Sequence, residues 1–541
     1  MTTDAHANLI QRVNVGDSLT RTAARHPDRI AVIDGDRRWR YGEFNAWVNQ
    51  VAGGLSGLGY QRGDAIALAS GNSAEFLATY YACAKLGVVC VPVNLGWRPD
   101  EVAYVLAHSQ ASGLVLETQL VAAMTPALQL TEAITTVIVA PGTGGPGIGG
   151  PGTGEPVPAA VAGRRWLSFE ELAAAGTAAE PQCFVADRDP ITYLYTSGTT
   201  AFPKGVIGNH TAIYLESMTM ALEARFAADD RFAALLPMFH TAQLNCHCTP
   251  AIMVGATIYV LRGFDPGGLL ELIETQRLTQ IFGLPMMYRA MLDHPDIGRR
   301  DLSSLRRACY AMAPMPDAQL KRCLETFGCD FYLLFGQTEM SPTVTMFRPE
   351  HQLSHAGAVG TPVVNIQVAI MDPGGALLPD GEQGEVVYRG PHTMSGYLKD
   401  PEATQAAFAH GWFHSGDVGY FDPDGILWFT DRRKDVIKSG GENVASIEVE
   451  KAVYAADPRV AEVVVVGLPH DHWGEAITAV VVPRPGEKLD EGELIEGVKQ
   501  HLDAYKAPKS VIFVEELPKT STGKIQKNLV RDSFAAHYAG S

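Results

Sequence analysis

The sequence predicts an α/β protein of two domains, a large N-terminal α/β domain and a small C-terminal α+β domain. The chain has 541 residues, more than one hydrophobic core usually accommodates, so at least two domains are expected. Between Gly63 and Ala140, short apolar runs alternate with helical patterns, which is typical of a parallel sheet with helices packed on it. After Asp435 the predicted order is helix, strand, strand, helix, strand and helix, which indicates a second, smaller unit.

The elements of the first region are predicted from its apolar residues. Short continuous runs predict buried strands at Ala65–Ala69, Val88–Val93, Leu114–Leu116 and Thr136–Val139. Between the first two, helical spacing predicts a helix with one buried face, formed by Phe76, Tyr80, Cys83 and Ala84. The segment Pro141–Glu155 contains a literal GxGxxG. Its prolines prevent the helix that a dinucleotide site requires after the glycines, so a flexible loop is predicted there.

The later part of the chain has strands separated by turn residues. Glu385–Tyr388 and Ile426–Phe429 are predicted strands, and the second follows the turn Asp422-Pro-Asp-Gly425. The smaller unit is predicted to contain helices at Val449–Tyr454 and Glu491–Leu502, strands at Val460–Val466, Ala476–Val482 and Ser510–Val514, and a C-terminal helix. A boundary is expected near Lys434, which gives domains 1–433 and 434–541.

Composition excludes several classes of protein. The 43 basic and 60 acidic residues give a net charge of −17, and so negative a surface repels nucleic-acid phosphates. The eight cysteines are scattered without a CxxC pair, which indicates free thiols in a reducing compartment. Met1–Thr20 lacks the features of a secretory signal, and no apolar run is long enough to span a membrane. We therefore expect a cytoplasmic protein.

The strongest local signal for chemistry is the segment Tyr195–Gly205, with the sequence YTSGTTAFPKG. It follows a predicted strand, Ile191–Leu194. Hydroxyl groups, a glycine and a lysine suit the oxygens of a phosphate group, and the candidate ligands are Thr196, Ser197, Gly198, Thr199, Thr200 and Lys204. The order of residues differs from the GxxxxGK[ST] loop of P-loop enzymes. Composition alone also fits an ordinary loop rich in serine and threonine.

Further motifs occur along the chain at Leu236–His240 (LPMFH), Phe335–Glu339 (FGQTE), Gly384–Leu398, Trp412–Asp417 (WFHSGD), Asp431–Gly441 (DRRKDVIKSGG) and Pro518–Lys524 (PKTSTGK). Together with the phosphate loop, they resemble the motifs of the adenylate-forming superfamily, which contains acyl-CoA synthetases, carrier-protein adenylation domains and luciferases. The resemblance extends from about Leu19 to Leu529. It implies the fold of these enzymes, with a large N-terminal domain of several sheets and a small mobile C-terminal domain.

The resemblance assigns roles in forming an acyl-adenylate. Lys524 would offset the negative charge where a carboxylate attacks the α-phosphate of ATP. Thr338 and Glu339 would hold Mg²⁺, which prefers oxygen ligands. Asp417 and Arg432 would bind the ribose hydroxyls. The other residues implied to contact ATP or AMP are the phosphate loop, Gly336 and Gln337.

Transfer of the acyl group to a thiol is implied to use another orientation of the small domain. Lys434 is the implied hinge, and rotation would bring the loop Lys438–Gly441 to the adenylate. Lys438, and His240 where the thiol enters, complete the implied catalytic residues. Ser439, Gly440 and Gly441 would contact coenzyme A, because glycine lets a backbone approach a narrow ligand closely. The implied acyl-pocket residues are Thr241, Leu244, Ala311, Met312 and Ala313.

The sequence therefore predicts an AMP-forming acyl-CoA synthetase that uses ATP, Mg²⁺, coenzyme A and an apolar carboxylic acid, whether fatty, alicyclic or aromatic. Three alternatives stay open. They are an adenylating enzyme that loads a carrier protein or stops at the adenylate, a luciferase-like oxygenase, and a binding protein without catalysis. No nucleic-acid partner is expected, and a homodimer is compatible with the sequence.

The chain departs from the superfamily at several positions. Ala201 replaces the usual glycine of the phosphate loop, Phe335 replaces a tyrosine, and Ser446 stands where proline is common. The segment Ala311–Pro314 (AMAP) replaces the common Gly-Gly-Ala-Pro. Met312 is therefore expected to shorten or bend the acyl pocket, which favours medium-length, cyclic or aromatic acids. The alternative is that Met312 points into the core and the acyl chain passes elsewhere.

Overall fold

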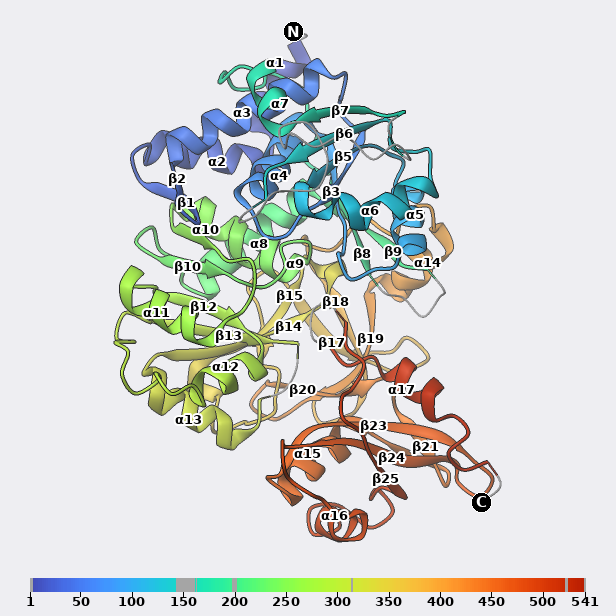
Figure 1. Ribbon diagram of the computed structural model, residues 1–541. Coiled ribbons are helices and arrows are strands. Elements are labelled where there is room, and N and C mark those ends of the chain that lie inside the picture. Colours follow the sequence, from blue (N-terminus) through green and yellow to red (C-terminus); the bar gives the residue numbers. More distant parts are fainter. Residues whose placement is uncertain are drawn as a thin grey trace.

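The computed structural model describes residues 3–142, 161, 163–196, 202–312, 315–520 and 524–539. The N-terminal part contains two large sheets and a small antiparallel sheet, and the C-terminal part forms a sheet of its own (Figure 1). This arrangement confirms the predicted large α/β domain and smaller α+β domain. Within the described ranges, no helix combines the length and the apolar character needed to cross a bilayer.

A sheet of seven strands carries the phosphate loop. Its order is β7-β6-β5-β3-β4-β8-β9, and neighbours run parallel except for the antiparallel pair β8 and β9. The strands are β3 (Ala65–Ala69), β4 (Val89–Pro92), β5 (Ala111–Glu117), β6 (Thr136–Ala140), β7 (Arg165–Ser168), β8 (Pro190–Thr196) and β9 (Lys204–Asn209). The strands predicted from apolar runs, and their parallel pairing, are confirmed.

The helix predicted between the first two of these strands is α4 (Ala74–Leu86). The prediction of a single buried face is wrong, because every residue of α4 is buried. The helix packs against α2 (Val15–Arg25) and α3 (Tyr41–Gly57) as well as strand β4, so it has no side facing water. Even Lys85 is buried, and its ammonium group donates a hydrogen bond to Glu180 at 2.8 Å.

A second sheet has nine strands in the order β16-β15-β14-β13-β12-β10-β11-β1-β2. They are β1 (Ile30–Asp34), β2 (Arg37–Arg40), β10 (Arg231–Ala234), β11 (Thr257–Val260), β12 (Gln280–Gly283), β13 (Arg307–Ala311), β14 (Asp330–Gly336), β15 (Thr343–Phe347) and β16 (Thr361–Pro362). One apolar core includes side chains from both large sheets, such as Leu68 and Phe232, and from the helices between them. The two sheets therefore form one folded unit.

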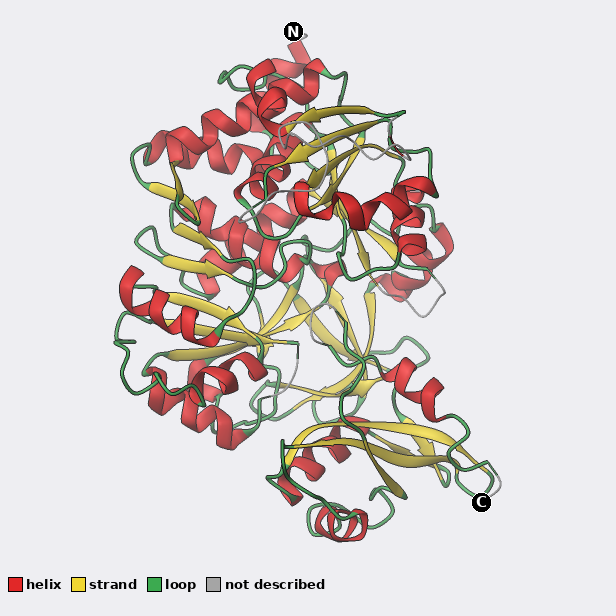
Figure 2. Cartoon of the chain, in the orientation of Figure 1, coloured by secondary structure: helices red, strands yellow, loops and turns green. Residues whose placement is uncertain are grey.

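The helices of this unit lie in Figure 2 between and around the sheets. Besides those named above they are α1 (Thr3–Gln11), α5 (Pro99–His108), α6 (Val121–Gln129), α7 (Phe169–Ala175), α8 (His210–Glu223), α9 (Thr241–Gln243), α10 (Thr249–Val254), α11 (Pro266–Gln276), α12 (Pro285–Leu292), α13 (Asp317–Phe327) and α14 (Pro401–Ala407). Helices α8 and α10 pack on each other and on α2, which fills the space between the two sheets.

A small antiparallel sheet leads to the C-terminal part. Its strands, in order, are β17 (Gln367–Met371), β18 (Gly384–Arg389), β19 (Phe413–Phe421) and β20 (Leu427–Arg432). In Figure 1, β19 and β20 lie between the N-terminal sheets and the C-terminal part. The predicted strand at Glu385–Tyr388 lies within β18. The one predicted at Ile426–Phe429 is β20, which continues to Arg432.

The C-terminal sheet has the order β22-β21-β24-β23, with β25 paired to β24. The elements are β21 (Ile437–Ser439), β22 (Glu442–Val444), α15 (Ser446–Ala456), β23 (Val460–His470), β24 (Gly474–Pro483), α16 (Glu491–Val498), β25 (Ser510–Phe513) and α17 (Lys527–Phe534). Val463 and Val465 pack with α15 and α16, whereas Val464 and Val466 pack with α17. Both faces are thus covered by the domain's own helices. The predicted elements are present, but α16 ends at Val498 and not at Leu502.

Candidate active site

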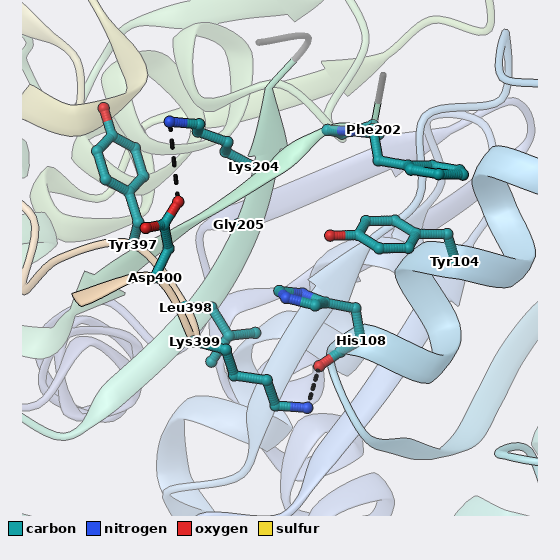
Figure 3. A pocket seen from close by; sticks show the side chains of 10 residues that line it. Tyr104, His108, Phe202, Lys204, Gly205, Tyr397, Leu398, Lys399 and Asp400 are labelled. Carbon is teal, nitrogen blue, oxygen red and sulfur yellow. Dashed lines mark hydrogen bonds and ion pairs between the residues drawn. The ribbon is translucent and has the colours of Figure 1, made fainter. Parts of the chain in front are cut away.

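Strands β8 and β9 hold the two ends of the phosphate loop. Thr196, the last residue of β8, pairs with Lys204, the first residue of β9. The predicted phosphate ligands Ser197, Gly198, Thr199 and Thr200 lie outside the described residues. The ammonium of Lys204 lies 5.2 Å from the centre of the Tyr397 ring and 3.8 Å from the carboxylate of Asp400 (Figure 3). A positive charge therefore stands where the loop returns to the sheet.

Beyond Lys204, a pocket of about 390 Å³ opens between α5 and the segment Tyr397–Asp400 (Figure 3). On the α5 side, Tyr104 stacks between Phe202 and His108, with ring centres 4.5 Å and 5.0 Å away. Stacked rings of this kind stabilise each other beyond the area they bury. The stack therefore fixes Phe202, which follows the phosphate loop, against the N-terminal unit.

Glu339 follows the carboxyl end of β14. The strand ends at Gly336, where a Cβ would come within 1.9 Å of a backbone carbonyl oxygen, so only glycine fits. The chain continues through Gln337 into a short 3₁₀ helix, Thr338–Met340. The hydroxyl of Tyr397 donates a hydrogen bond of 2.9 Å to Oε1 of Glu339. This bond orients a carboxylate that is half-buried and still accessible to a ligand.

Asp417 and Arg432 face each other on the neighbouring strands β19 and β20. Nε of Arg432 lies 3.0 Å from Oδ1 of Asp417, but without the alignment of a hydrogen bond. Asp417 is 2% exposed, and among the described residues its Oδ1 accepts no hydrogen bond. Burial raises the pKa of Asp417, and the charges of Arg432 and Lys524 oppose this rise. A buried carboxylate oxygen without a donor fits the hydroxyl group of a ribose.

Lys524 reaches the same place from the C-terminal part. Loss of hydration and the charge of Arg432 lower the pKa of Lys524 to about 8, and the charge of Asp417 opposes this. The side chain is nevertheless accessible to solvent. Its charge also acts on His240. The structure therefore brings together the motifs that carry His240, Asp417, Arg432 and Lys524, which lie far apart in the sequence.

His240 precedes the short helix α9 and caps it. The N–H of Ala242 donates a hydrogen bond of 3.3 Å to Nδ1 of His240, so the neutral ring carries its proton on Nε2. Burial and the charge of Lys524 lower the pKa of His240 to about 4. The ring is therefore neutral near pH 7, and Nε2–H can donate a hydrogen bond to an oxygen of a bound acid.

The chain passes from β20 to β21 through a turn that contains Lys434. Lys434 is exposed, and the carboxylate of the next residue, Asp435, forms an ion pair with Arg531. This turn is the covalent link between the small antiparallel sheet and the C-terminal sheet. It is the position at which the sequence predicts a hinge.

The predicted coenzyme A loop is a β-hairpin. Gly440 and Gly441 join β21 to β22 with φ of 63° and 90°, as in a type I′ turn. The two glycines thus have a structural reason that is independent of coenzyme A. Lys438 is exposed and Ser439 is buried. The N–H of Gly440 donates to the carbonyl of Trp473, so this turn is bound within the C-terminal part.

Comparison with known proteins agrees with this geometry. Residues 19–398 match the family described as AMP-binding enzyme, and residues 448–524 match the AMP-binding enzyme C-terminal domain. A feruloyl-CoA synthase from Amycolatopsis sp is 36% identical over 522 residues, which cover 96% of this chain and 99% of that protein. The chain belongs to the AMP-binding enzyme family. The predicted activity of an AMP-forming acyl-CoA ligase is thereby confirmed at the level of reaction type.

Three solved structures, of two similar proteins, are informative. An anthranilate CoA ligase in complex with anthranoyl-AMP has a TM-score of 0.86 and 26% identity, and covers 96% of this chain and 97% of its own. ATP-bound MatB from Rhodopseudomonas palustris has a TM-score of 0.85 and 28% identity, and covers 98% of this chain and 100% of its own. Apo MatB has a TM-score of only 0.76. This AMP-binding enzyme therefore superposes better on the ATP-bound form.

The predicted acyl-pocket residues of this AMP-binding enzyme lie on two elements. Thr241 and Leu244 are buried, and Leu244 begins a π-helical turn, a form that is frequent at functional sites. Ala311 ends β13 and is buried. Met312 follows it, half-buried against the main core, with φ of 70°. Ala313 lies outside the described residues. Met312 thus holds a conformation that glycine adopts without strain.

The motifs assign no role to Tyr397 or to Ser446. In the structure, Tyr397 contacts Glu339, and Ser446 contacts Asp431. Tyr397 donates a hydrogen bond to Glu339. The only indication of this in the sequence is that Tyr397 lies inside the motif Gly384–Leu398 and carries a hydroxyl group. Ser446 donates hydrogen bonds to Asp431 from its backbone N–H and its hydroxyl. The indication for Ser446 in the sequence is that serine replaces the proline expected at this position of the motif. Lys519, in the same motif as Lys524, forms an ion pair with Glu462.

Proposed function

We propose that this AMP-binding enzyme joins an aromatic or other cyclic apolar carboxylic acid to coenzyme A through an acyl-adenylate. The convergence of Lys524, Arg432, Asp417 and His240 carries the proposal. Attack of a carboxylate on a phosphate brings two anions together, and preorganised cations lower the free energy of that encounter. Lys524 and Arg432 supply these cations, and His240 is a neutral donor beside them.

In the first step, a carboxylate oxygen of the acid attacks the α-phosphorus of ATP. The new O–P bond forms, the bond from the α-phosphorus to the bridging oxygen breaks, and pyrophosphate leaves with the electron pair. Lys524 offsets the charge that accumulates on the α-phosphate oxygens. The free Oδ1 of Asp417 accepts a hydrogen bond from a ribose hydroxyl, and Arg432 donates one.

We further propose that Glu339 and Thr338 hold Mg²⁺ with ATP. Mg²⁺ is usually held by one or two carboxylates together with substrate phosphates, and the accessible, oriented carboxylate of Glu339 fits that pattern. The metal would neutralise phosphate charge and make pyrophosphate a better leaving group. Lys204, at the end of the phosphate loop, supplies a further positive charge on the same side.

For the second step, we propose that residues 434–541 turn about Lys434 and bring the hairpin Lys438–Gly441 to the adenylate. In the present orientation Lys524 lies close enough to Arg432 and Asp417 for their charges to act on it, which supports a mechanism in which this lysine must move away before a thiol reaches the adenylate. The better superposition on ATP-bound MatB supports this orientation as the adenylate-forming one. The thiol sulfur then attacks the acyl carbonyl carbon. The C–S bond forms, the bond to the phosphate oxygen breaks, AMP leaves and the thiol proton passes to solvent.

The preference for a cyclic acid rests on Met312. A non-glycine residue with φ of 70° stores strain of about 1–2 kcal/mol. Such strain is typical of functional sites, and we propose that the thioether narrows the acyl pocket beside Ala311. A feruloyl-CoA synthase and an anthranilate CoA ligase, named for aromatic acids, are both similar to this chain.

The test is a panel of acids assayed for coenzyme A-dependent release of AMP. We expect kcat/KM to be higher for aromatic and alicyclic acids than for straight-chain acids of equal carbon number. Met312→Gly should relieve backbone strain and raise kcat/KM for longer straight chains, by up to about 0.8 kcal/mol for each methylene newly accommodated. A wild-type optimum at long straight chains would contradict the proposed acid class. Turnover only with a phosphopantetheinylated carrier protein would contradict coenzyme A as acceptor.

The compartment and the assembly are also proposals. All eight cysteines are free thiols, which supports a reducing compartment such as the cytoplasm. A homodimer remains compatible with the chain, and light scattering of the purified protein measures its mass directly.

A further inference from the structure

The N-terminus of α15 is held from across the proposed hinge. The residue before the helix, Ala445, has no side chain that can cap it. Asp431, at the end of β20, takes this place. Its Oδ2 accepts hydrogen bonds from the N–H of Ser446 at 2.6 Å and from the hydroxyl of Ser446 at 2.7 Å. A carboxylate at a helix N-terminus also interacts favourably with the helix dipole.

The two partners lie on opposite sides of Lys434. Asp431 is 1% exposed, Ser446 is fully buried, and the pair has no competing water at its surface. Asp431 belongs to the N-terminal side, next to Arg432, whereas Ser446 is the first residue of the first C-terminal helix. Rotation about Lys434 would separate them. Hydrogen bonds to a charged group are stronger than neutral ones, so their loss opposes the rotation.

Ser446 is also connected to the segment that carries Lys524. The ammonium of Lys527 donates a hydrogen bond to the hydroxyl oxygen of Ser446 and lies 2.9 Å from the carboxylate of Glu450. Lys527 is the first residue of α17, which directly follows the Lys524 segment. Hydrogen bonds thus connect Asp431 through Ser446 to Lys527, which follows Lys524 by three residues in the chain.

We propose that Ser446 is a positioning residue for adenylate formation. Its two hydrogen bonds to Asp431 stabilise the orientation in which Lys524 reaches the reacting centre, relative to the orientation that forms the thioester. The proposal rests on the two-orientation mechanism described above. We call these two hydrogen bonds the latch. A proline at this position has neither the N–H nor the hydroxyl, so it could not form the latch.

Ser446→Pro removes both hydrogen bonds with little cost to the helix. Proline is favoured at the first helical position, where the N–H has no partner within the helix. Ala445 has φ of −72° and ψ of 120°, an extended conformation that a following proline tolerates. Ser446→Thr keeps both donors and should behave as wild type. Ser510→Ala is the matched control, because it removes a serine–carboxylate bond, to Glu491, that lies within the C-terminal part.

The experiment measures both half-reactions in the full chain. Acid-dependent ATP–pyrophosphate exchange reports adenylate formation, and single-turnover mixing of enzyme, supplied acyl-adenylate and coenzyme A reports thioester formation. For Ser446→Pro we expect the ratio of thioester rate to exchange rate to rise about tenfold or more, which corresponds to about 1.4 kcal/mol between the orientations. Ser446→Ala, which keeps the backbone N–H bond, should give a smaller rise. Ser446→Thr and Ser510→Ala should leave the ratio unchanged.

The outcomes are distinguishable. An unchanged ratio in Ser446→Pro, or an equal fall of both rates, would mean that Ser446 only stabilises the fold and would overturn the proposal. Thermal unfolding separates a folded variant from a misfolded one, and Ser446→Ala supplies the same test if the proline variant does not fold. Wild-type enzyme without acid-dependent exchange would overturn the proposed function itself. If wild-type enzyme shows normal exchange and Ser446→Pro leaves the ratio of the two rates unchanged, only the proposed positioning role of Ser446 would be overturned.

Discussion

The lowered pKa of Lys524 makes adenylate formation sensitive to alkaline pH. An unperturbed lysine has a pKa near 10.4 and stays charged through pH 9. Loss of hydration and Arg432 lower the pKa of Lys524 to about 8. The group is charged below this value and neutral above it, and in the proposed mechanism the charged form offsets phosphate charge. Adenylate formation should therefore be supported at pH 7 and be lost as the pH rises through 8.

The size of the effect follows from the titration. At pH 9, one unit above the pKa, about one-tenth of Lys524 remains charged, so kcat/KM for exchange should fall about tenfold per pH unit there. His240, with a pKa of about 4, does not titrate in this range. Bound acid and ATP bring negative charge and raise the pKa of Lys524, so the decline in kcat should lie at higher pH than the decline in kcat/KM.

The assay is ATP–pyrophosphate exchange between pH 6.5 and 10 without coenzyme A, because the thiol of coenzyme A titrates in the same range. Lys524→Arg keeps a positive charge above pH 12 and should abolish the alkaline decline, whatever its absolute rate. Lys524→Ala should slow exchange by roughly 10²-fold or more. Lys519→Arg, in the same motif but paired with Glu462, is the control and should keep the wild-type profile. An alkaline decline that persists unchanged in Lys524→Arg would refute the assignment.

Other substitutions test the remaining contacts. Asp417→Asn should raise the KM for ATP by about tenfold or more, because a hydroxyl of the substrate loses a charged hydrogen-bond acceptor. Thermal stability should not fall, because the substitution also removes a charge that is buried in the folded protein. Tyr397→Phe releases the carboxylate of Glu339 and should raise the Mg²⁺ concentration that gives half-maximal exchange, with the KM for the acid unchanged. Gly441→Ala should lower the free energy of unfolding by about 1 kcal/mol, because φ is 90° and no atom crowds the new Cβ. Gly440→Ala should cost more, since its Cβ would lie 3.0 Å from Trp473.

The strands and the reacting groups follow from the sequence to different degrees. Continuous apolar runs such as Ala65–Ala69 predict strands well, because a strand buried on both faces contains little else. The same reasoning fails for α4, where helical spacing suggests one apolar face and the structure buries the whole helix. Alanines such as Ala78 and Ala82 let neighbouring helices approach α4 closely, and its charged Lys85 is buried because it is paired with Glu180. The spacing of apolar residues on one face of a helix does not show whether other elements cover its opposite face.

The residues of the candidate site are predicted from motifs and not from physical pattern. Nothing in the local sequence around Asp417 indicates that its Oδ1 is buried without a hydrogen-bond donor, since the neighbours that bury it come from other strands. Glycines are the opposite case. Gly440 and Gly441 attract a functional interpretation, yet the hairpin they join requires positive φ at both positions. Gly336 is likewise required by backbone geometry, because a Cβ at this position would collide with a backbone carbonyl oxygen. Glycine in a motif therefore indicates backbone geometry first and ligand approach second.

The nature of the contacts between the two parts explains how one fold can serve two half-reactions. Among the described residues, the apolar clusters of the C-terminal sheet contain no side chain from the N-terminal part, because α15, α16 and α17 cover both faces. The proposed rotation would therefore expose neither of these clusters. Contacts between the two parts include hydrogen bonds, such as Arg289 to the carbonyl of Ala461 and Ser446 to Asp431. Water can replace such hydrogen bonds at a net cost of about 1 kcal/mol for a neutral pair and about 1.5–3 kcal/mol for a bond to a charged group. A few such hydrogen bonds are enough to favour one orientation of the C-terminal part. They do not stabilise it so strongly that the other orientation becomes inaccessible. In the proposed mechanism, the two hydrogen bonds from Ser446 to Asp431 therefore contribute to the balance between the two steps.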